Sequence, residues 1–121
     1  MSGDLLVRAR AVELILEGRV EEALKLLSKH YGVRPPRVKV GLPKKHARSL
    51  ACYDPSRRLI CLRSSEELRN PMVVLHEFYH HLRFTMGKHR GTEKHADRYA
   101  LESYRAYLAL HGEGRVKTGG D

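Results

Sequence analysis

His76-Glu77-Phe78-Tyr79-His80 lies within a stretch of sequence that carries the signals of a helix. Asn70 suits the N-cap, Pro71 the first helical position and Gly87 the terminator, so we expect a helix over residues 71–86. Side chains four residues apart on a helix share a face, so the two histidines can present their imidazoles to one metal ion. The glutamate between them then stands where a general base for a bound water is needed.

A third protein ligand is expected, because a catalytic zinc site usually has three and keeps its fourth position for water. The downstream candidates are His81, His89, Glu93, His95 and Asp97. Thr92 suits the N-cap of a second helix over residues 93–110, whose apolar face consists of Ala96, Ala100, Tyr104, Tyr107 and Leu108. Glu93 and Asp97 lie one turn apart on that face, whereas His95 points nearly the opposite way. We therefore choose Glu93 as the third ligand.

Asp97 suits a supporting role, because a metal-bound imidazole usually gives its other ring N–H to a carboxylate that fixes its orientation. The pattern of HExxH, a short loop and Glu93-x-x-x-Asp97 resembles the gluzincin zinc metallopeptidases. In that family zinc is bound by both histidines of HExxH and a glutamate of the following helix, and the aspartate supports the first histidine. Residues 93–100 are also similar to the E-x-x-A-(D/N)-x-(F/Y)-A stretch of ImmA/IrrE-type peptidases.

In size and layout the chain most resembles the archaeal minigluzincins, soluble single-domain proteins that are similar to the catalytic cores of integral-membrane metallopeptidases. The resemblance covers roughly residues 38–108, and its specific part is residues 76–97. It implies that His76, His80 and Glu93 hold Zn²⁺, which lowers the pKa of its water towards ~7. Glu77 then accepts a proton as the water attacks a peptide carbonyl, and passes it to the leaving amine. A further group must stabilise the oxyanion, and the candidates are His46, Tyr53, His89 and Tyr99.

The resemblance also implies where a peptide substrate binds. In gluzincins an exposed strand beside the zinc pairs antiparallel with the peptide, and residues 49–53 are the better candidate for such an edge. Leu50, Ala51 and Cys52 are accordingly expected to contact the substrate. Minigluzincins are described as zymogen-like, with a C-terminal segment in the active site. Residues 112–121 contain four glycines, so we expect a flexible tail whose residues 115–121 can return to the cleft.

Other readings of the pattern are weaker. A metzincin needs a third histidine six residues after the second, where this chain has Met86. A SprT-like DNA-associated protease would need His89 or His95 as ligand. Two alternatives stay open: a zinc-containing binding or regulatory module with little peptidase activity, and a basic nucleic-acid-binding protein in which HExxH is accidental.

Composition limits the rest of the prediction. The 121 residues, 41% of them hydrophobic, suit one domain over residues 1–111. The chain has no apolar run near the ~18 residues that span a bilayer and no signal peptide, so we expect a soluble cytoplasmic protein. One Asn, no Gln and 31% charged residues suit a hot archaeal source. The net charge of +9 makes nucleic acid a secondary partner hypothesis, although the basic residues are dispersed and cluster only in residues 44–48.

Upstream of HExxH we expect helices over residues 4–17 and 20–30, with Leu6 and Leu16 among the buried residues of the first. Alternating residues 38–42 predict a strand, and residues 50–53 and 59–63 predict a hairpin around a turn at 54–57. Residues 59–62 are the more continuously apolar arm and are expected inside the sheet. The predicted fold is α+β, with a small three-stranded mixed sheet, two N-terminal helices, an HExxH helix and a C-terminal glutamate helix.

Cys52 and Cys61 fall on the two arms of the hairpin. We treat both as buried thiols and leave open whether they form a disulfide.

Overall fold

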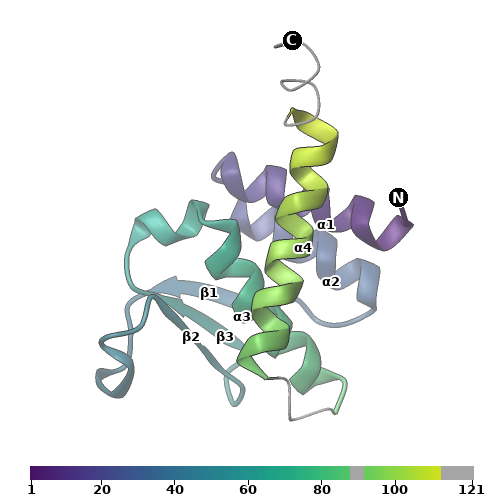
Figure 1. Ribbon diagram of the computed structural model, residues 1–121. Coiled ribbons are helices and arrows are strands. Elements are labelled where there is room, and N and C mark those ends of the chain that lie inside the picture. Colours follow the sequence, from purple (N-terminus) through teal and green to yellow (C-terminus); the bar gives the residue numbers. More distant parts are fainter. Residues whose placement is uncertain (88–91, 113–121) are drawn as a thin grey trace.

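The computed structural model describes residues 1–87 and 92–112, and confirms the α+β fold with the expected order of elements (Figure 1). The helices and strands are α1 (Gly3–Leu16), α2 (Val20–Tyr31), β1 (Arg37–Val40), β2 (Ala51–Asp54), β3 (Leu59–Leu62), α3 (Pro71–Thr85) and α4 (Glu93–His111). Two short 3₁₀ helices, η1 (Lys44–His46) and η2 (Ser65–Arg69), were not expected. A single turn is too short to show a hydrophobic period, so the sequence carries no signal for either.

The three strands form a mixed sheet in the order β1-β3-β2. β3 pairs parallel with β1 and antiparallel with β2, so residues 59–62 are interior and the arm that contains β2 is an edge, as expected. All four residues of β3 are buried. Ile60 and Leu62 enter the main core, while Leu59 and Cys61 form a small second cluster on the other face of the sheet. Cys52 lies directly opposite Cys61 in the β2–β3 register, and both thiols are buried and free.

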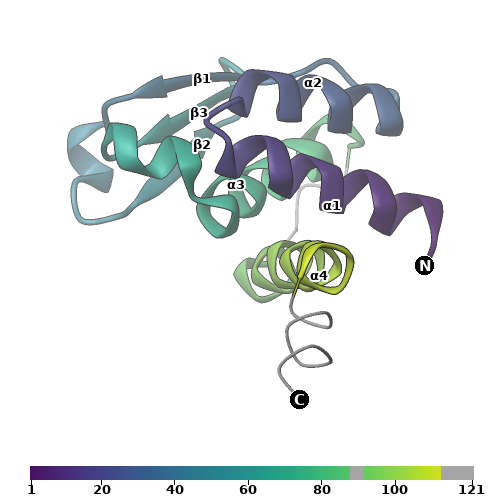
Figure 2. The ribbon, with the colours of Figure 1, turned by 90° about the horizontal axis from the view of Figure 1, so that it is seen from above.

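α3 is the central element of the fold. It packs against β2 and β3 on one side and against α4 on another. Seen from above, α4 lies on the opposite side of α1 and α3 from α2 and the sheet (Figure 2). Val74, Leu75 and Phe78 of α3 are fully buried, so the helix that carries HExxH is anchored by its apolar face. Among the described residues, none of the helices has both the length and the hydropathy that a bilayer span requires.

The contact between α1 and α4 differs from the expected one. Leu6 and Leu16 are 46% and 37% exposed, whereas Arg8 is buried against α4. The Arg8 side chain donates to Ser103 Oγ and to the carbonyl oxygen of Tyr99, both at 2.8 Å. A buried guanidinium with these acceptors is compatible with a core, which a count of apolar residues does not anticipate.

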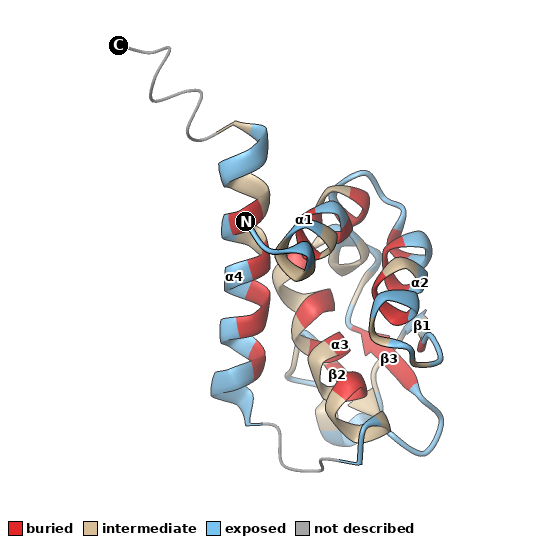
Figure 3. Cartoon of the chain, turned by 90° about the vertical axis from the view of Figure 1, so that its right-hand side faces the viewer, coloured by how far each residue is buried: buried red, intermediate tan, exposed pale blue. Residues whose placement is uncertain are grey.

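The buried face of α4 is therefore rotated from the predicted one, as the stripe of buried residues along α4 illustrates (Figure 3). Ala96 and Ala100 are buried as expected, but Tyr104, Tyr107 and Leu108 are only half-buried. Tyr99, Ser103 and Ala106 are buried in their place. The small side chains of Ser103 and Ala106 let α1 approach closely, and the guanidinium of Arg8 satisfies the hydroxyl of Ser103.

Candidate metal centre

Helix caps place the chemically active side chains at one end of the contact between α3 and α4. Asn70 Oδ1 accepts hydrogen bonds from the backbone N–H groups of Met72 and Val73, which fixes the start of α3. Thr92 Oγ1 accepts from the backbone N–H of His95, so α4 begins at Glu93. Both caps are the residues expected from the sequence. They hold HExxH and Glu93 on facing helices.

Three donor atoms from these helices converge on one point. Glu93 Oε1 lies 2.8 Å from His76 Nε2 and 2.7 Å from His80 Nε2. The two Nε2 atoms are 3.3 Å apart. The three residues expected from the sequence therefore form the group of potential metal-binding side chains found among the described residues.

The triangle of donor atoms fits a tetrahedral zinc site. Donors at about 2.0–2.1 Å from one zinc ion lie about 3.3–3.4 Å apart in a tetrahedron. The separation of the two imidazole nitrogens matches this value, and the two contacts with Glu93 are shorter by about 0.6 Å. Glu93 is exposed and is the first residue of α4, so its side chain has room to withdraw by that amount. Two imidazoles and one carboxylate also form a donor set typical of catalytic zinc.

Asp97 fixes the proton on the first histidine. Its Oδ1 lies 2.8 Å from His76 Nδ1, so the ring donates its Nδ1–H to the carboxylate. Nε2 of a neutral His76 then carries a lone pair, and that lone pair faces the carboxylate oxygen of Glu93 and the ring of His80. Lone pairs this close repel one another unless a cation, either protons or a metal ion, lies between them.

The ionisation of these residues reflects the same crowding. Burial alone would lower the pKa of His76, but hydrogen bonds to Glu93 and Asp97 and the charge of Glu77 raise it above its ordinary value. Partial burial would raise the pKa of Glu93, but hydrogen bonds from His80 and His76 hold it below its usual range. The pair therefore favours an ionised carboxylate next to positive charge, which is the environment that a divalent cation needs.

Glu77 lies beside the cluster but does not join it. Its side chain is buried, and burial raises its pKa to about 7. Among the residues that the structure describes, none makes a hydrogen bond to its carboxylate. A carboxylate that lines a cleft, lacks a protein partner and titrates near neutrality is suited to accept and return protons.

The cleft beside the cluster runs between β2 and α3. Glu77, Glu93, Ser49 and Ala51 border both halves of it. Ala51 and Cys52 line one half and Leu50 the other, so the three residues expected to contact substrate all border the cleft. β2 has no strand partner on its outer side within the described ranges, which leaves an edge for another chain.

Other sequence candidates lie elsewhere or are already engaged. His81 is fully buried; its Nε2–H donates to the carbonyl oxygen of Arg34, and its Nδ1 accepts from Tyr53 Oη, each at 2.7 Å. That bond occupies the Tyr53 hydroxyl, and the Tyr99 hydroxyl is paired with that of Tyr31. His95 is exposed and bonded to Thr92.

Of the four candidate oxyanion donors, His46 alone borders the cleft without a competing bond in the described part of the chain. His89 lies outside the described residues, as does the predicted tail beyond Gly112. The idea that residues 115–121 return to the cleft is therefore not addressed by the structure.

Arg83 and Phe84 also line the cleft and were not predicted to do so. Arg83 lies seven residues after His76 and three after His80, so helical spacing places it near the face that carries the ligands. The spacing can be seen in the sequence, but a role in lining a cleft cannot, because β2 forms the other side of that cleft.

Comparisons of this chain with family models, with curated proteins and with solved structures found no match. The chemistry of the site is therefore inferred from its own residues and geometry.

Proposed function

We propose that this protein is a zinc-dependent metallopeptidase of the gluzincin type. The observation that supports it best is the convergence of His76, His80 and Glu93 in a cleft, beside a buried Glu77 carboxylate that has no hydrogen-bond partner among the described residues. A structural zinc site usually surrounds its metal with four protein ligands, and three ligands next to a base are the pattern of a hydrolytic site. His76, His80 and Glu93 would hold the metal.

Zinc bound there would supply Lewis acidity, lowering the pKa of water and polarising a peptide carbonyl. The protein's own residues supply proton transfer and orientation. Glu77 accepts a proton on its carboxylate from the attacking water and later donates it to the leaving amine. Asp97 keeps the Nδ1–H of His76 in place, so that Nε2 of the neutral ring presents its lone pair to the site.

Two further features of the cleft suit a peptide. The outer edge of β2, which has no partner among the described strands, offers backbone N–H and C=O groups to an extended peptide. Such pairing binds the peptide backbone whatever its sequence. The bond between Tyr53 and His81 joins β2 to α3 and keeps this edge at a fixed distance from Glu77. His46, on η1, is placed to donate to a developing oxyanion.

Metal analysis and peptide cleavage test the proposal in sequence. Protein purified without added metal should contain one zinc per chain, as measured by inductively coupled plasma mass spectrometry, and should cleave unstructured peptides. Glu77→Gln should retain the zinc and lose cleavage by a factor of about 100 or more. Zinc without cleavage by the wild type would reduce the site to a metal-binding module, and absence of zinc would refute the proposal.

A further inference from the structure

The cleft has two unlike halves that meet at the metal centre. On the side beyond His80, which we call the Arg83 half, the lining residues are His46, Tyr53, Pro55, Arg83 and Phe84. On the side before His76, which we call the Met72 half, they include Leu50, Met72 and Val73. The Met72 half thus combines apolar side chains near the start of α3 with the carboxylate of Asp97, while the Arg83 half contains a cation.

Arg83 has no hydrogen-bond acceptor or ion-pair partner in the part of the chain that the structure describes. Its side chain is half-buried, and its Nε is buried without a hydrogen-bond partner among the described residues. The guanidinium lies over the ring of Tyr79, 6.0 Å from its centroid, which orients the group but accepts no conventional hydrogen bond. A buried donor without an acceptor costs free energy and calls for an explanation in a native protein. No described carboxylate pairs with this guanidinium, so its charge is available to an anion in the cleft that it lines. A carboxylate is the acceptor that a guanidinium binds best.

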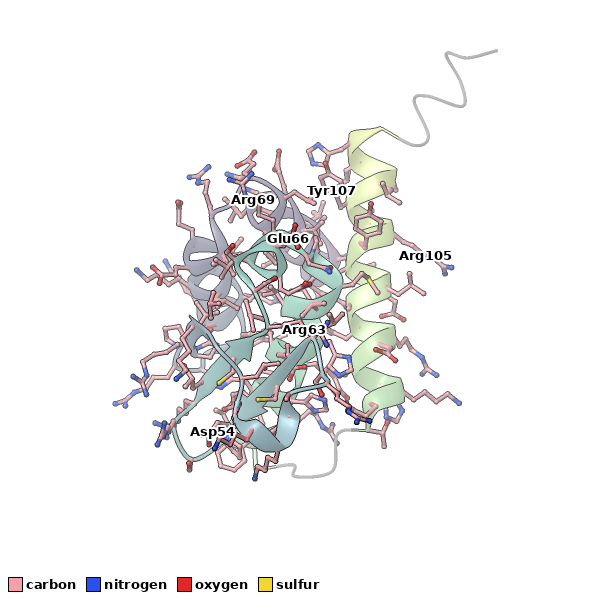
Figure 4. The ribbon with its side chains drawn as sticks, turned by 90° about the vertical axis from the view of Figure 1, so that its left-hand side faces the viewer. Asp54, Arg63, Glu66, Arg69, Arg105 and Tyr107 are labelled. Carbon is pink, nitrogen blue, oxygen red and sulfur yellow. The ribbon has the colours of Figure 1, made fainter. Side chains whose placement is uncertain are left out.

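The sheet and its loops, on the β2 side of the cleft, carry an excess of positive charge. Residues 31–65, which make up the sheet and its loops, contain nine Lys or Arg and one acidic residue, Asp54. They account for +8 of the net charge of +9, although the basic residues look dispersed in the sequence. All nine are exposed, and Arg57 alone has a carboxylate within 4.0 Å among the described residues, that of Asp54 at 3.8 Å. Figure 4 views this side, where Asp54 and Arg63 mark the two ends of the β2–β3 hairpin.

The helices, by contrast, balance their charges internally. Arg8, Arg10 and Arg19 each form an ion pair with a glutamate or aspartate nearby in the sequence. Outside residues 31–65 the chain has 14 Lys or Arg and 13 Asp or Glu, so the excess of cations lies on the sheet and its loops. The cations of η1 lie next to His46, which borders the cleft. Such a surface raises the local concentration of anionic partners and speeds their association.

We propose that the site binds acidic polypeptide segments, with an acidic side chain held by Arg83 in the Arg83 half and the cations of residues 31–65 steering the segment to the cleft. This inference rests on the proposed peptidase function and names its substrate class. A peptide fits better than a nucleic acid, because single-stranded nucleic acids bind through stacking on exposed aromatic rings. The aromatic residues of this segment, Tyr31 and Tyr53, are half-buried with their hydroxyls bonded inside the fold.

The first arm of the test measures cleavage. Internally quenched peptides should differ only by Glu, Gln or Lys at one scanned position. At the preferred position, zinc-loaded wild type should favour Glu over Lys by about 10- to 100-fold in kcat/KM. Arg83→Glu should reverse the order, and Arg83→Lys should keep part of the preference for Glu. The matched control is Arg105→Glu, on the side of α4 away from the sheet (Figure 4), which changes the net charge equally and should leave the preference unchanged.

The second arm measures binding and does not need turnover. Fluorescence anisotropy with Glu77→Gln should give at least about tenfold tighter binding of the best Glu peptide than of its Lys counterpart. Binding should weaken as salt rises, and the double variant Glu77→Gln, Arg83→Glu should lose the preference.

The two arms separate failure of the substrate class from failure of the proposed function. Cleavage of Glu, Gln and Lys peptides at equal rates would overturn the acidic preference while leaving the peptidase intact. No cleavage, but binding of Glu peptides that depends on Arg83, would refute the peptidase and support the acidic-segment site. Tighter binding of a single-stranded oligonucleotide than of any Glu peptide, unaffected by Arg83→Glu, would assign the cationic sheet to nucleic acid and overturn the proposal.

Discussion

Asp97 Oδ1 lies 2.8 Å from Nδ1 of His76, across the contact between α4 and α3. The same helix supplies Glu93, one turn earlier, to the other nitrogen of that ring. Both ring nitrogens of His76 are therefore held by α4, whereas His80 contacts the described part of this helix only through Glu93. The docking of α4 determines the orientation of His76, and removal of Asp97 tests that dependence.

Asp97→Ala should weaken zinc binding by about 10- to 100-fold without abolishing it, because it frees the ring of His76 but removes no ligand. Asp97→Asn should have a smaller effect, since an amide oxygen still accepts the Nδ1–H. Competition with a chromogenic chelator gives the affinities. Equal zinc affinity in the wild type and both variants would show that the hydrogen bond does not orient the ligand.

His76→Ala, His80→Ala and Glu93→Ala should each abolish tight zinc binding, because each removes one of three protein donors. His95→Ala serves as a control, since His95 is exposed on α4 and, among the described residues, bonds only to the helix cap Thr92. The measurement is the zinc content of each variant after gel filtration in a buffer that contains a weak chelator. If Glu93→Ala retained zinc and His95→Ala lost it, the assignment of Glu93 as the third ligand would be wrong.

Metal-free protein should lose stability as pH rises through the titration of Glu77. Burial raises the pKa of this carboxyl from 4.5 to about 7. The folded state then holds the proton more tightly than the unfolded state, so the contribution is fully present below pH 4.5 and is lost as pH rises to about 7. The loss should be about 3 kcal/mol, at about 1.4 kcal/mol for each tenfold change in proton affinity.

Urea unfolding of the metal-free protein between pH 4.5 and 7.5 measures this slope. Glu77→Gln should flatten it, because the amide does not titrate. Glu66→Gln, which changes an exposed carboxylate on η2, should leave the slope as in the wild type. Parallel curves for wild type and Glu77→Gln would mean that the Glu77 carboxyl is not desolvated.

Arg8→Ala should destabilise the fold by about 3 kcal/mol, because it removes buried hydrogen bonds to Ser103 and Tyr99 together with the ion pair to Asp4. Zinc affinity should fall as well, since α4 is held less firmly against α3. Arg10→Ala, which breaks an exposed ion pair with Glu13, should cost less than about 1 kcal/mol. Thermal unfolding with and without zinc compares the two variants. Equal losses would indicate that Arg8 does not anchor α4.

The parts of the fold that were predictable are those with local signals. Asn70, Thr92 and the glycine after α3 mark helix ends through their own backbone preferences, and they do so wherever the rest of the chain lies. The grouping of HExxH with Glu93 followed from helical spacing on two elements joined by a short loop.

The features that were missed depend on contacts between distant segments. Arg8 reads as a surface residue until Ser103, 95 positions away, supplies an acceptor. Arg83 reads as an exposed residue on an amphipathic helix until β2 makes a cleft beside it. The cations of residues 31–65 look scattered along the chain, and only strand pairing shows that they belong to one sheet and its loops.

β2 and α3 run in the same direction along the cleft, since Leu50 lines the same half as Met72 and Val73, while Tyr53 and Pro55 line the same half as Arg83 and Phe84. A peptide that pairs antiparallel with β2 therefore enters with its N-terminal part at the Arg83 half. The acidic residue would precede the scissile bond, and an apolar residue would follow it. The polarity of β2 thereby determines the orientation of the bound peptide, so that a sequence and its reversal are different substrates.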